Sequence, residues 1–483
     1  MHHIISSCKR DLLDIYKHAI EAVKPERLVK NCIVIGDGKF MVNDPLDSSL
    51  KPLEYDLNGR RLHVIGGGKC VLAMARGLAE IARTTRTTSL FSNGCLSVPI
   101  QASPLFESDR VTQDLMGCLD ISVNFGSKDN LPDADSVKAT HCILEKINEA
   151  SRIDKNDKVR SLFVVLISGG GSACLTSPKH VSLEEKSDMI KRLVQHGADI
   201  VELNTVRRYF SHVKGGNLSR HIMKNNPDSQ VISLIISDVI NDPIEIIASG
   251  PTCLSLSEVD LYQSMIDVMT KYNLRVTNYP GGNHLSNNDN SHSVQNRIIG
   301  NNLLALNSLR SRADQLGYRT TLLGNDLSGS TNDILKHILN HDRAETDRSL
   351  IIGGGESTVL KGPGESWGVG GRVQEMALDY MSHKLSIESP WEVDSTIDMF
   401  MAGSTDGQDG PTDVAGCLAS VSDWSLSKNF NLDDLIRAKK THDSYNFWTK
   451  YRPDWLIKTG LSGTNVMDLY MLMNVRKTST REC

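Results

Sequence analysis

The chain has 483 residues, too many for one ordinary hydrophobic core, so its length predicts two domains. Hydrophobic residues make up 39% of the sequence and charged residues 23%, and no apolar run is long enough to cross a bilayer, which argues against a membrane-spanning protein. The formal net charge of -5 offers no basic field for a phosphate backbone, which argues against nucleic acid as the main partner.

The cysteines and the N-terminal segment indicate a cellular compartment. The ten cysteines are scattered, without a Cys-x-x-Cys motif or zinc-like spacing, which favours a reducing environment over a disulfide framework. Residues 1–28 contain no apolar signal region and no small-residue cleavage pattern, so they predict a helix of the mature chain. We therefore expect a cytoplasmic protein, with a mitochondrial location left open.

Short runs of β-branched and apolar residues recur along the chain, and each stops abruptly at glycine or aspartate. Buried parallel strands end in this way. Helical patterns separate the runs, for example residues 70–81 and residues 183–200, the latter behind a Ser182-x-x-Glu185 capping box. The runs and their endings are 62–65 before Gly66-Gly67-Gly68, 162–167 before Ser168-Gly169-Gly170-Gly171, 231–236 before Ser237-Asp238, 350–352 before Gly353-Gly354-Gly355, and 399–401 before Gly403-Ser404-Thr405-Asp406.

This alternation predicts an α/β protein with mainly parallel sheets flanked by helices. Residues 276–296 are rich in Asn, Ser, Gly and Pro and predict a linker or surface loop. We therefore expect a Rossmann-like domain over residues 1–275 and a smaller α/β domain over residues 297–483. Because ligands bind beyond the carboxyl ends of such strands, the five endings predict one active-site rim.

Glycine-rich turns after strands let backbone amides approach an anion, and the following helix adds its positive end. The alternative is a tight turn without any ligand. We also include polar side chains next to the glycines and the basic group around Lys214 among the predicted anion-binding residues. For the basic group, the alternative is a solvated helix face. The predicted phosphate- or nucleotide-binding residues are Gly67, Gly68, Ser168, Gly169, Gly170, Gly171, Ser172, Lys214, Gly354, Gly355 and Glu356.

The first glycine triplet does not match either standard nucleotide motif. It lacks the third glycine and the acidic ribose ligand of a dinucleotide-binding fingerprint. It also fails as a Walker loop, because His63 stands at the upstream glycine position and Cys70 at the Mg²⁺-binding Ser/Thr position. Lys69 remains, at a strand-to-helix turn that suits a point charge on a phosphoryl group.

Arg372 follows the glycine segment 368–371, where a guanidinium is suited to clamp a carboxylate or a transferring phosphoryl group. A surface arginine is the alternative. Carboxylates in the strand-end loops could hold Mg²⁺ or accept a hydroxyl proton, although aspartate is also an ordinary turn residue. Residues 405–413 contain more of them than a turn requires. We predict Asp406 as catalytic and Asp238, Asp409 and Asp413 as metal ligands.

Two series of motifs occur in the same order as in class II glycerate kinases, which the chain resembles. The upstream series resembles that family's N-terminal signatures: Ile167 to Ala173, Val206-Arg207-Arg208, Ser211 to Gly216, Ser237-Asp238, Asp242-Pro243 and Ala248 to Thr252. The downstream series resembles its C-terminal MOFRL domain: Gly353 to Glu356, Gly370-Gly371-Arg372 with Gln374-Glu375, Thr405 to Asp413, and Thr459-Gly460 to Asp468. The N-terminal helix and residues 130–133 resemble the animal branch.

The resemblance implies a kinase that uses ATP and Mg²⁺ to convert D-glycerate into 2-phosphoglycerate in a cleft between two α/β domains. Lys69 and Arg372 would stabilise the transferring phosphoryl group, and Asp406 or Asp409 would organise Mg²⁺ or the attacking hydroxyl. Val373 departs from the family, which usually has Asn there. Two alternatives stay open: an NAD(P)-dependent hydroxypyruvate reductase, and a non-catalytic nucleotide or metabolite sensor, for which Val373 is the argument.

Overall fold

The computed structural model describes residues 2–255, 257–274, 293–341, 347–360, 367–387, 396–424 and 431–476. The chain divides into two compact units. Residues 25–300 form one, which we call the Rossmann-type unit. Residues 1–24 and 301–483 form the other, which we call the mixed-sheet unit.

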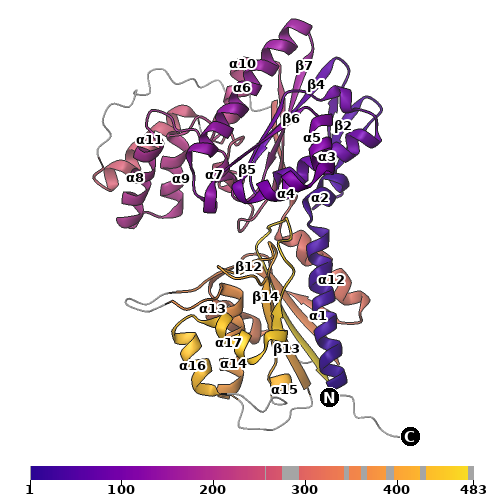
Figure 1. Ribbon diagram of the computed structural model, residues 1–483, viewed down its shortest axis with the longest axis vertical. Coiled ribbons are helices and arrows are strands. Elements are labelled where there is room, and N and C mark those ends of the chain that lie inside the picture. The colour runs from indigo at the N-terminus through magenta and orange to yellow at the C-terminus, as the bar shows by residue number, and fades with distance from the viewer. Residues whose placement is uncertain are drawn as a thin grey trace. The chain divides into compact units, whose positions relative to one another are not determined.

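Six parallel strands form the main sheet of the Rossmann-type unit (Figure 1). In spatial order they are β6 (Ile121–Gly126), β5 (Gly94–Pro99), β4 (Arg60–Gly67), β7 (Arg160–Ile167), β8 (Gln230–Ile236) and β9 (Val294–Gly300). Counted along the chain, this is the order 3-2-1-4-5-6 of a dinucleotide-binding fold. The predicted Rossmann-like parallel sheet is confirmed, and its order reverses between β4 and β7.

Helices and a small hairpin sheet surround the six strands. One predicted helix start is confirmed, because α8 begins at the Ser182–Glu185 capping box. Helix α6 begins at a similar box formed by Asp133 and Ser136, which was not predicted from the sequence. The helices are α2 (Pro25–Cys32), α3 (Val71–Thr84), α4 (Ser103–Ser108), α5 (Arg110–Cys118), α6 (Ala134–Asp157), α7 (Gly171–Cys174), α8 (Leu183–Gln195), α9 (Ile200–Tyr209), α10 (Asn217–Asn225) and α11 (Glu258–Lys271), and the antiparallel sheet contains β1 (Ile33–Gly36), β2 (Lys39–Val42) and β3 (Leu53–Asp56).

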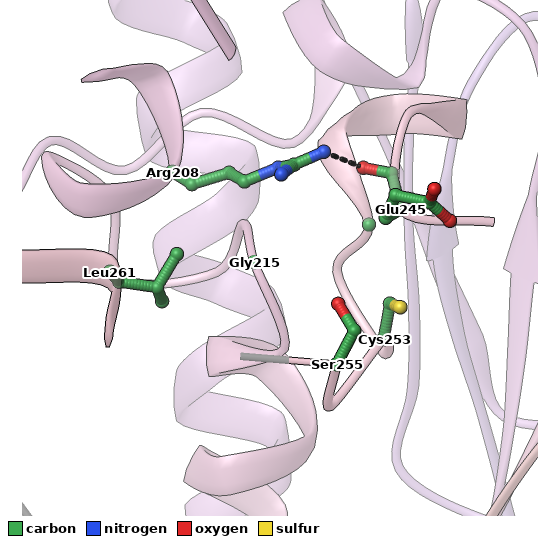
Figure 2. A pocket seen from close by; sticks show the side chains of 7 residues that line it. Arg208, Gly215, Glu245, Cys253, Ser255 and Leu261 are labelled. Atoms are coloured by element: carbon green, nitrogen blue, oxygen red, sulfur yellow. Dashed lines mark hydrogen bonds between the residues drawn. The ribbon is translucent and has the colours of Figure 1, made fainter. Parts of the chain in front are cut away.

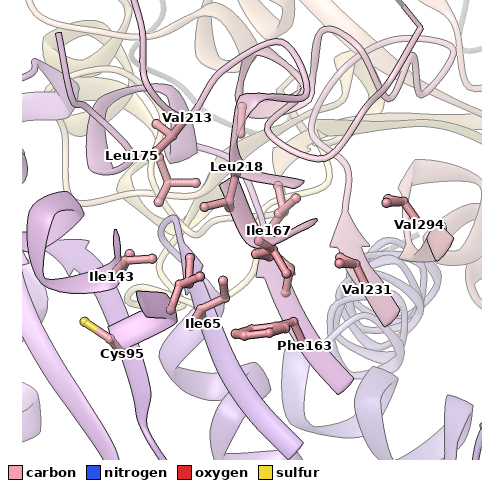
Figure 3. Packing of buried hydrophobic residues seen from close by; sticks show 14 of the residues in the cluster. Ile65, Cys95, Ile143, Phe163, Ile167, Leu175, Val213, Leu218, Val231 and Val294 are labelled. Carbon is pink, nitrogen blue, oxygen red and sulfur yellow. The ribbon is translucent and has the colours of Figure 1, made fainter. Parts of the chain in front are cut away.

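The core of this unit is built on the central strands (Figure 3). Ile65 on β4 and Phe163 and Ile167 on β7 are almost completely buried, as expected for strands covered on both faces. Leu175 and Val213 join the same cluster from segments that follow the strands. The loops beyond the carboxyl end of β7 are therefore anchored in the core.

The mixed-sheet unit contains seven strands: β10 (Arg319–Leu322), β11 (Leu327–Ser330), β12 (Arg348–Thr358), β13 (Thr396–Ser404), β14 (Gly416–Ala419), β15 (Leu456–Ile457) and β16 (Asp468–Arg476). β12 pairs in parallel with β10 and β11, whereas β16 lies between β12 and β13 and runs antiparallel to both. This sheet is mixed, not mainly parallel as expected, because the last strand enters without a helical crossover. β12 and β13 still point the same way, so their carboxyl ends share one edge.

The helices of this unit are α1 (His2–Ala22), α12 (Asn302–Gln315), α13 (Thr331–Asn340), α14 (Arg372–Ile387), α15 (Val421–Trp424), α16 (Leu432–Lys440) and α17 (Ser444–Tyr451). Seen in Figure 1, α1 and α12 lie side by side, and they are in extensive contact. Within the described parts of the chain, no helix has both the length and the apolar character that a membrane span requires.

The division into units differs from the predicted one in two places. Helix α1 packs on the mixed-sheet unit because its buried stripe, Leu12, Ile15 and Ala19, covers α12, β13 and β16. Hydrogen bonds from Arg312 to Asp14 and from Tyr318 to Asp11 fix its polar side. Residues 276–292 of the predicted linker lie outside the described residues, and residues 294–296 open strand β9.

We predict that Leu12→Ala lowers the free energy of unfolding of the mixed-sheet unit by about 2–5 kcal/mol, because it leaves a cavity under α1. Urea denaturation followed by circular dichroism measures the loss. Lys17→Ala, on the exposed side of the same helix, is the control and is expected to change stability by less than about 0.5 kcal/mol. An equal effect of both substitutions would contradict the packing of α1.

Candidate active site

Two glycine segments meet where the strand order of the Rossmann-type unit reverses. Gly68 and Lys69 follow β4, and residues 168–171 follow the adjacent β7. The Lys69 N–H donates to the Gly169 carbonyl over 2.9 Å, and the Cys70 N–H donates to the Ser168 hydroxyl over 2.9 Å. The structure therefore joins the first two predicted glycine motifs into one feature at the position where α/β sheets bind ligands.

Close backbone approach explains the glycines. A Cβ atom on Gly68, whose φ is +142°, would lie 2.5 Å from Ser168 Oγ, and a Cβ atom on Gly169 would overlap the carboxylate of Asp238. Asp238 comes from the end of β8, so three adjacent strands contribute. We call Gly68, Lys69, residues 168–170 and Asp238 the cradle.

Lys69 is the exposed cation of the cradle. Its side chain runs along Gly170, where an added Cβ atom would lie 3.0 Å from Lys69 Cγ. None of the described residues accepts a hydrogen bond from its ammonium group. Lys69 is thus available to an anionic ligand, as the sequence predicts.

Two of the predicted ligand glycines serve the packing of the protein itself. A Cβ atom on Gly67 would lie 2.7 Å from Leu175 Cγ, and a Cβ atom on Gly171 would lie 2.7 Å from Ala248 Cβ. The Ser172 hydroxyl is likewise engaged, at 2.9 Å from the Ser249 hydroxyl. These three residues support the cradle from below and do not fit the predicted direct contact with a ligand.

Lys214 also does not fit its predicted role of ligand contact. The side chain is buried, and its ammonium donates to the carbonyls of Ser172 (2.5 Å) and Leu175 (2.9 Å). Burial, with Lys186 and Arg207 nearby, lowers the pKa of Lys214 well below its usual value. Since the ammonium is enclosed by the protein, it does not reach a ligand in the cradle.

A second enclosed cation of the Rossmann-type unit is Arg208 (Figure 2). Arg208, at the end of α9, donates from Nη2 to the Glu245 carbonyl over 2.5 Å. Glu245 belongs to the loop that follows β8. The hollow between them, which Gly215 and Leu261 also line, has no room for a ligand. Arg208 thus ties α9 to that loop.

In the mixed-sheet unit, Arg372 opens helix α14 and is held by two carboxylates. Its Nε and Nη2 atoms donate to the two oxygens of Asp468, at 2.7 and 3.2 Å, and Nη1 donates to Glu356. Asp468 is the first residue of β16 and is in register with Gly355 on β12 and Ser404 on β13. The bidentate pair therefore stands at the shared carboxyl edge of β12 and β13.

Burial dominates the electrostatics of Asp468. It raises the pKa of this fully enclosed carboxyl to about 7, although Arg372 acts in the opposite direction. A guanidinium with a partner of this kind is pre-oriented. A phosphoryl or carboxylate group of a ligand would compete with Glu356 for its outer edge, since the Glu356 side chain is the more exposed of the two partners.

The loop 405–413 is built around Asp409, which caps α14. Its carboxylate accepts from the backbone N–H of Val373 (3.2 Å), from the backbone N–H of Gln374 (3.0 Å) and from Gln374 Nε2 (2.9 Å). Burial raises the pKa of Asp409 to about 6. Asp409 is engaged on both oxygens and does not fit the predicted metal role.

Asp413 and Asp406 differ in their surroundings. Asp413 is exposed and binds Lys458 Nζ (2.7 Å) and the Tyr445 hydroxyl (2.8 Å), which lowers its pKa. Asp406 is half-buried and accepts from the Ser404 hydroxyl over 2.9 Å. The described residues contain no cluster of three or more potential metal ligands. Of the predicted metal ligands, Asp238 belongs to the Rossmann-type unit, whereas Asp409 and Asp413 belong to the mixed-sheet unit.

The third glycine triplet is not a strand-to-helix turn, because β12 continues through it to Thr358. A Cβ atom on Gly354 would overlap the Asn302 amide, and one on Gly355 would overlap the Leu327 carbonyl. The Asn302 amide in turn donates to the Asp468 carbonyl over 3.0 Å. Gly354 and Gly355 are thus required by internal packing and form no open site for an anion.

Sequence reasoning missed Tyr16 and Asp468 as site residues. The buried Tyr16 hydroxyl of α1 donates to the Ser404 carbonyl (2.5 Å), below Asp406. Asp468 had a signal, since it is a lone charge before the apolar residues 469–473. Val373, by contrast, is completely buried, so its side chain points away from any ligand and gives the sensor alternative no support.

Comparison with known proteins gives a family match in each half of the chain. Residues 11–280 match the family described as "Domain of unknown function (DUF4147)", and residues 349–468 match the MOFRL family. The mouse protein named glycerate kinase is 32% identical, over 95% of this chain and 92% of its own length. The chain belongs to the glycerate kinase family. The resemblance seen in the sequence is thereby confirmed.

Bacterial members of the glycerate kinase family cover the chain equally well. A Thermotoga maritima protein named D-glycerate 2-kinase is 28% identical, over 96% of this chain and 97% of its own length. The crystal structure of glycerate kinase from that organism has a TM-score of 0.71 and 26% identity, covering 98% of this chain and all of the other. The reductase alternative has no counterpart among these relatives.

Glu375, in the first turn of α14, is a buried carboxyl near the Arg372 end of that helix. Burial and the neighbouring Asp379 raise its pKa to about 8. Oε1 lies 3.2 Å from His442 Nδ1. Because the pKa in the folded state is above the value of about 4.5 for an unfolded Glu, the folded protein retains this proton to higher pH.

We predict that Glu375→Gln becomes more stable relative to the wild type as the pH rises from about 5 to about 8. Over this window the wild type loses up to about 1.4 kcal/mol per pH unit, because only the unfolded Glu ionises, and Gln cannot ionise. Urea titrations at pH 5.5, 7.0 and 8.5 measure the difference. Glu21→Gln, at an exposed position of α1, is the control for removal of a carboxyl group. A stability difference between Glu375→Gln and the wild type that does not change with pH would refute the prediction.

Proposed function

We propose that this protein is a kinase that transfers the γ-phosphoryl group of ATP to the 2-hydroxyl of D-glycerate, releasing 2-phosphoglycerate and ADP. The observation that carries the proposal is family membership over nearly the whole chain, with relatives named glycerate kinase in animals and D-glycerate 2-kinase in a bacterium.

The cradle supports a role in binding the phosphate groups of ATP. Gly68 and Gly169 let the two strand-end turns and Asp238 approach one another closely, and the half-buried Gly170 lies beside the Lys69 side chain. Lys69 adds an exposed positive charge beside them. Phosphoryl transfer depends on positioning and charge neutralisation more than on covalent chemistry, so these features suit the reaction.

Arg372 supplies the second cation. We assign it to the transferring phosphoryl group or the glycerate carboxylate, either of which takes a bidentate guanidinium. Asp406, half-buried beside Ser404, is the carboxylate that we assign to orienting the attacking hydroxyl. The pair with Asp468 fixes the guanidinium before the ligand arrives, so little ordering remains to be done on binding.

Mg²⁺ is the remaining expectation. When bound with ATP it supplies charge neutralisation, and it usually needs only one or two protein carboxylates because waters and phosphates complete its shell. Asp238, against Gly169 in the cradle, is the residue that we assign to it. Asp409 and Asp413 have other partners and are not assigned to the metal.

A reducing compartment such as the cytosol is the location that we propose. All nine described cysteines are free thiols. Even Cys95 and Cys142, whose sulfur atoms are 3.3 Å apart, are not bonded, since a disulfide requires about 2.05 Å.

We predict that the purified protein phosphorylates D-glycerate with Mg²⁺ and ATP, and that enolase converts the product without added phosphoglycerate mutase. The formation of phosphoenolpyruvate is followed by its ultraviolet absorbance. A signal that appears only after mutase is added would mean a 3-phosphate product. Silence with and without mutase would refute the kinase assignment.

We predict that Lys69→Ala lowers kcat for glycerate phosphorylation by about 10²–10³-fold, because it removes a charge from the transferring phosphoryl group. The fold is expected to stay intact, since the side chain is exposed. Arg83→Ala, an exposed cation near the far end of α3, is the matched control with normal kcat. Near-normal turnover by Lys69→Ala would remove this residue from the active site.

A further inference from the structure

Two buried lysines of the Rossmann-type unit each hold the carboxyl-terminal end of a helix. Lys186 Nζ donates to the carbonyls of Arg207 (3.1 Å) and Phe210 (2.6 Å), at the end of α9. Lys214 Nζ donates to the carbonyls of Ser172 and Leu175, along and just beyond α7. The two lysines are alike in burial and chemistry. Of the two helices that they hold, only α7 directly follows cradle residues.

Helix α7 contains four residues, so little of its own structure fixes its direction. It starts at Gly171, directly after the cradle residues 168–170. Lys214 bonds to its second residue and to the residue that follows it. The ammonium group therefore adds a charged donor to a helix whose carbonyls also accept from the hydroxyls of Ser97, Thr140 and Thr176.

The segment around Lys214 also holds the other neighbour of α7. The N–H groups of Gly215 and Gly216 donate to the carbonyls of Ser249 (2.9 Å) and Gly250 (2.7 Å). Ala248 and Ser249 have φ values of +51° and +63°, a left-handed conformation that is unfavourable for a residue with a side chain. The strained turn places Ala248 against Gly171 and the Ser249 hydroxyl on Ser172.

Burying an ammonium is costly, and a methionine of similar length would fill the same space without that cost. None of the described carboxylates pairs with Lys214, and Lys186 and Arg207 add unfavourable charge nearby. The protein therefore sacrifices stability here for the two hydrogen bonds to α7. Positions of this kind are expected where geometry matters for function.

We infer that Lys214 is a positioning residue: by clamping α7, it keeps the cradle in the geometry that binds the phosphate groups of ATP. The inference rests on the proposed function for the identity of the ligand. It assigns Lys214 no contact with ATP or glycerate and no part in proton transfer.

The test compares Lys214→Met with Lys186→Met. The second substitution removes a similar buried ammonium group that holds α9, a helix that contains no cradle residue. We measure urea stability, the Kd of Mg-ATP by calorimetry, and KM for ATP and kcat. Lys214→Met is expected to raise Kd and KM for ATP by about tenfold or more, the effect of losing two charge-assisted hydrogen bonds, with kcat at saturating ATP changed less than about threefold. Lys186→Met is expected to lose stability while its ATP affinity stays within about twofold of the wild type.

Unchanged ATP affinity in Lys214→Met, or an equal loss of affinity in both variants, overturns the inference, because either result reduces Lys214 to a structural residue. If Lys214→Met does not fold, Lys214→Gln, which keeps a neutral donor, is judged by the same criteria. Hydrogen exchange of the amides of residues 169–175 is measured on the same proteins without ligand. A wild-type protein that neither binds ATP nor phosphorylates D-glycerate refutes the proposed function. In that case, faster amide exchange in the Lys214 variant alone still supports the clamp on α7. Equal exchange in the wild type and the Lys214 variant overturns it.

Discussion

The parallel pairing of β4 with β7 is the constraint on which the Rossmann-type unit depends. At this pair the strand order reverses, which is the position where α/β sheets bind ligands. Glycines at both strand ends let the segments approach each other and admit Asp238 from β8. Lys69 then emerges as the exposed charge. Each of these features follows from the positions at which β4 and β7 end.

The mixed-sheet unit reaches a comparable result by different means. Here an antiparallel strand, β16, begins between the ends of β12 and β13 and brings Asp468 to that edge. Its buried carboxylate fixes Arg372 from behind, as Asp409 fixes the backbone of the same helix turn. Each unit thus presents one cation: Lys69 has an exposed ammonium group, and the guanidinium of Arg372 is held by Asp468. Phosphoryl transfer requires positioned positive charge of this kind.

Local sequence patterns were sufficient for the α/β class, for the strand ends and for the capping box at Ser182, since each rests on neighbouring residues. They were insufficient wherever a partner lies far along the chain. Asp409 caps a helix that begins 37 residues earlier, and its aspartate-rich loop resembles a metal site from the sequence alone. Gly354 follows an apolar run like the other triplets, but its strand continues because β12 pairs there with β16 and β11, which are distant in the sequence. The sequence predicted that Lys214 contacts a ligand, because the neighbouring residues do not indicate that its side chain is buried.

The position of α1 has a consequence for how the chain is made. The Rossmann-type unit is an insertion within the mixed-sheet unit, because the latter is formed by residues 1–24 and 301–483. During synthesis the inserted unit is complete long before β16 leaves the ribosome. Helix α1 precedes the inserted unit in the chain, whereas α12, β13 and β16, on which it packs, all follow that unit. Leu12 and Ile15 therefore reach their buried positions only after the whole inserted unit has been synthesised.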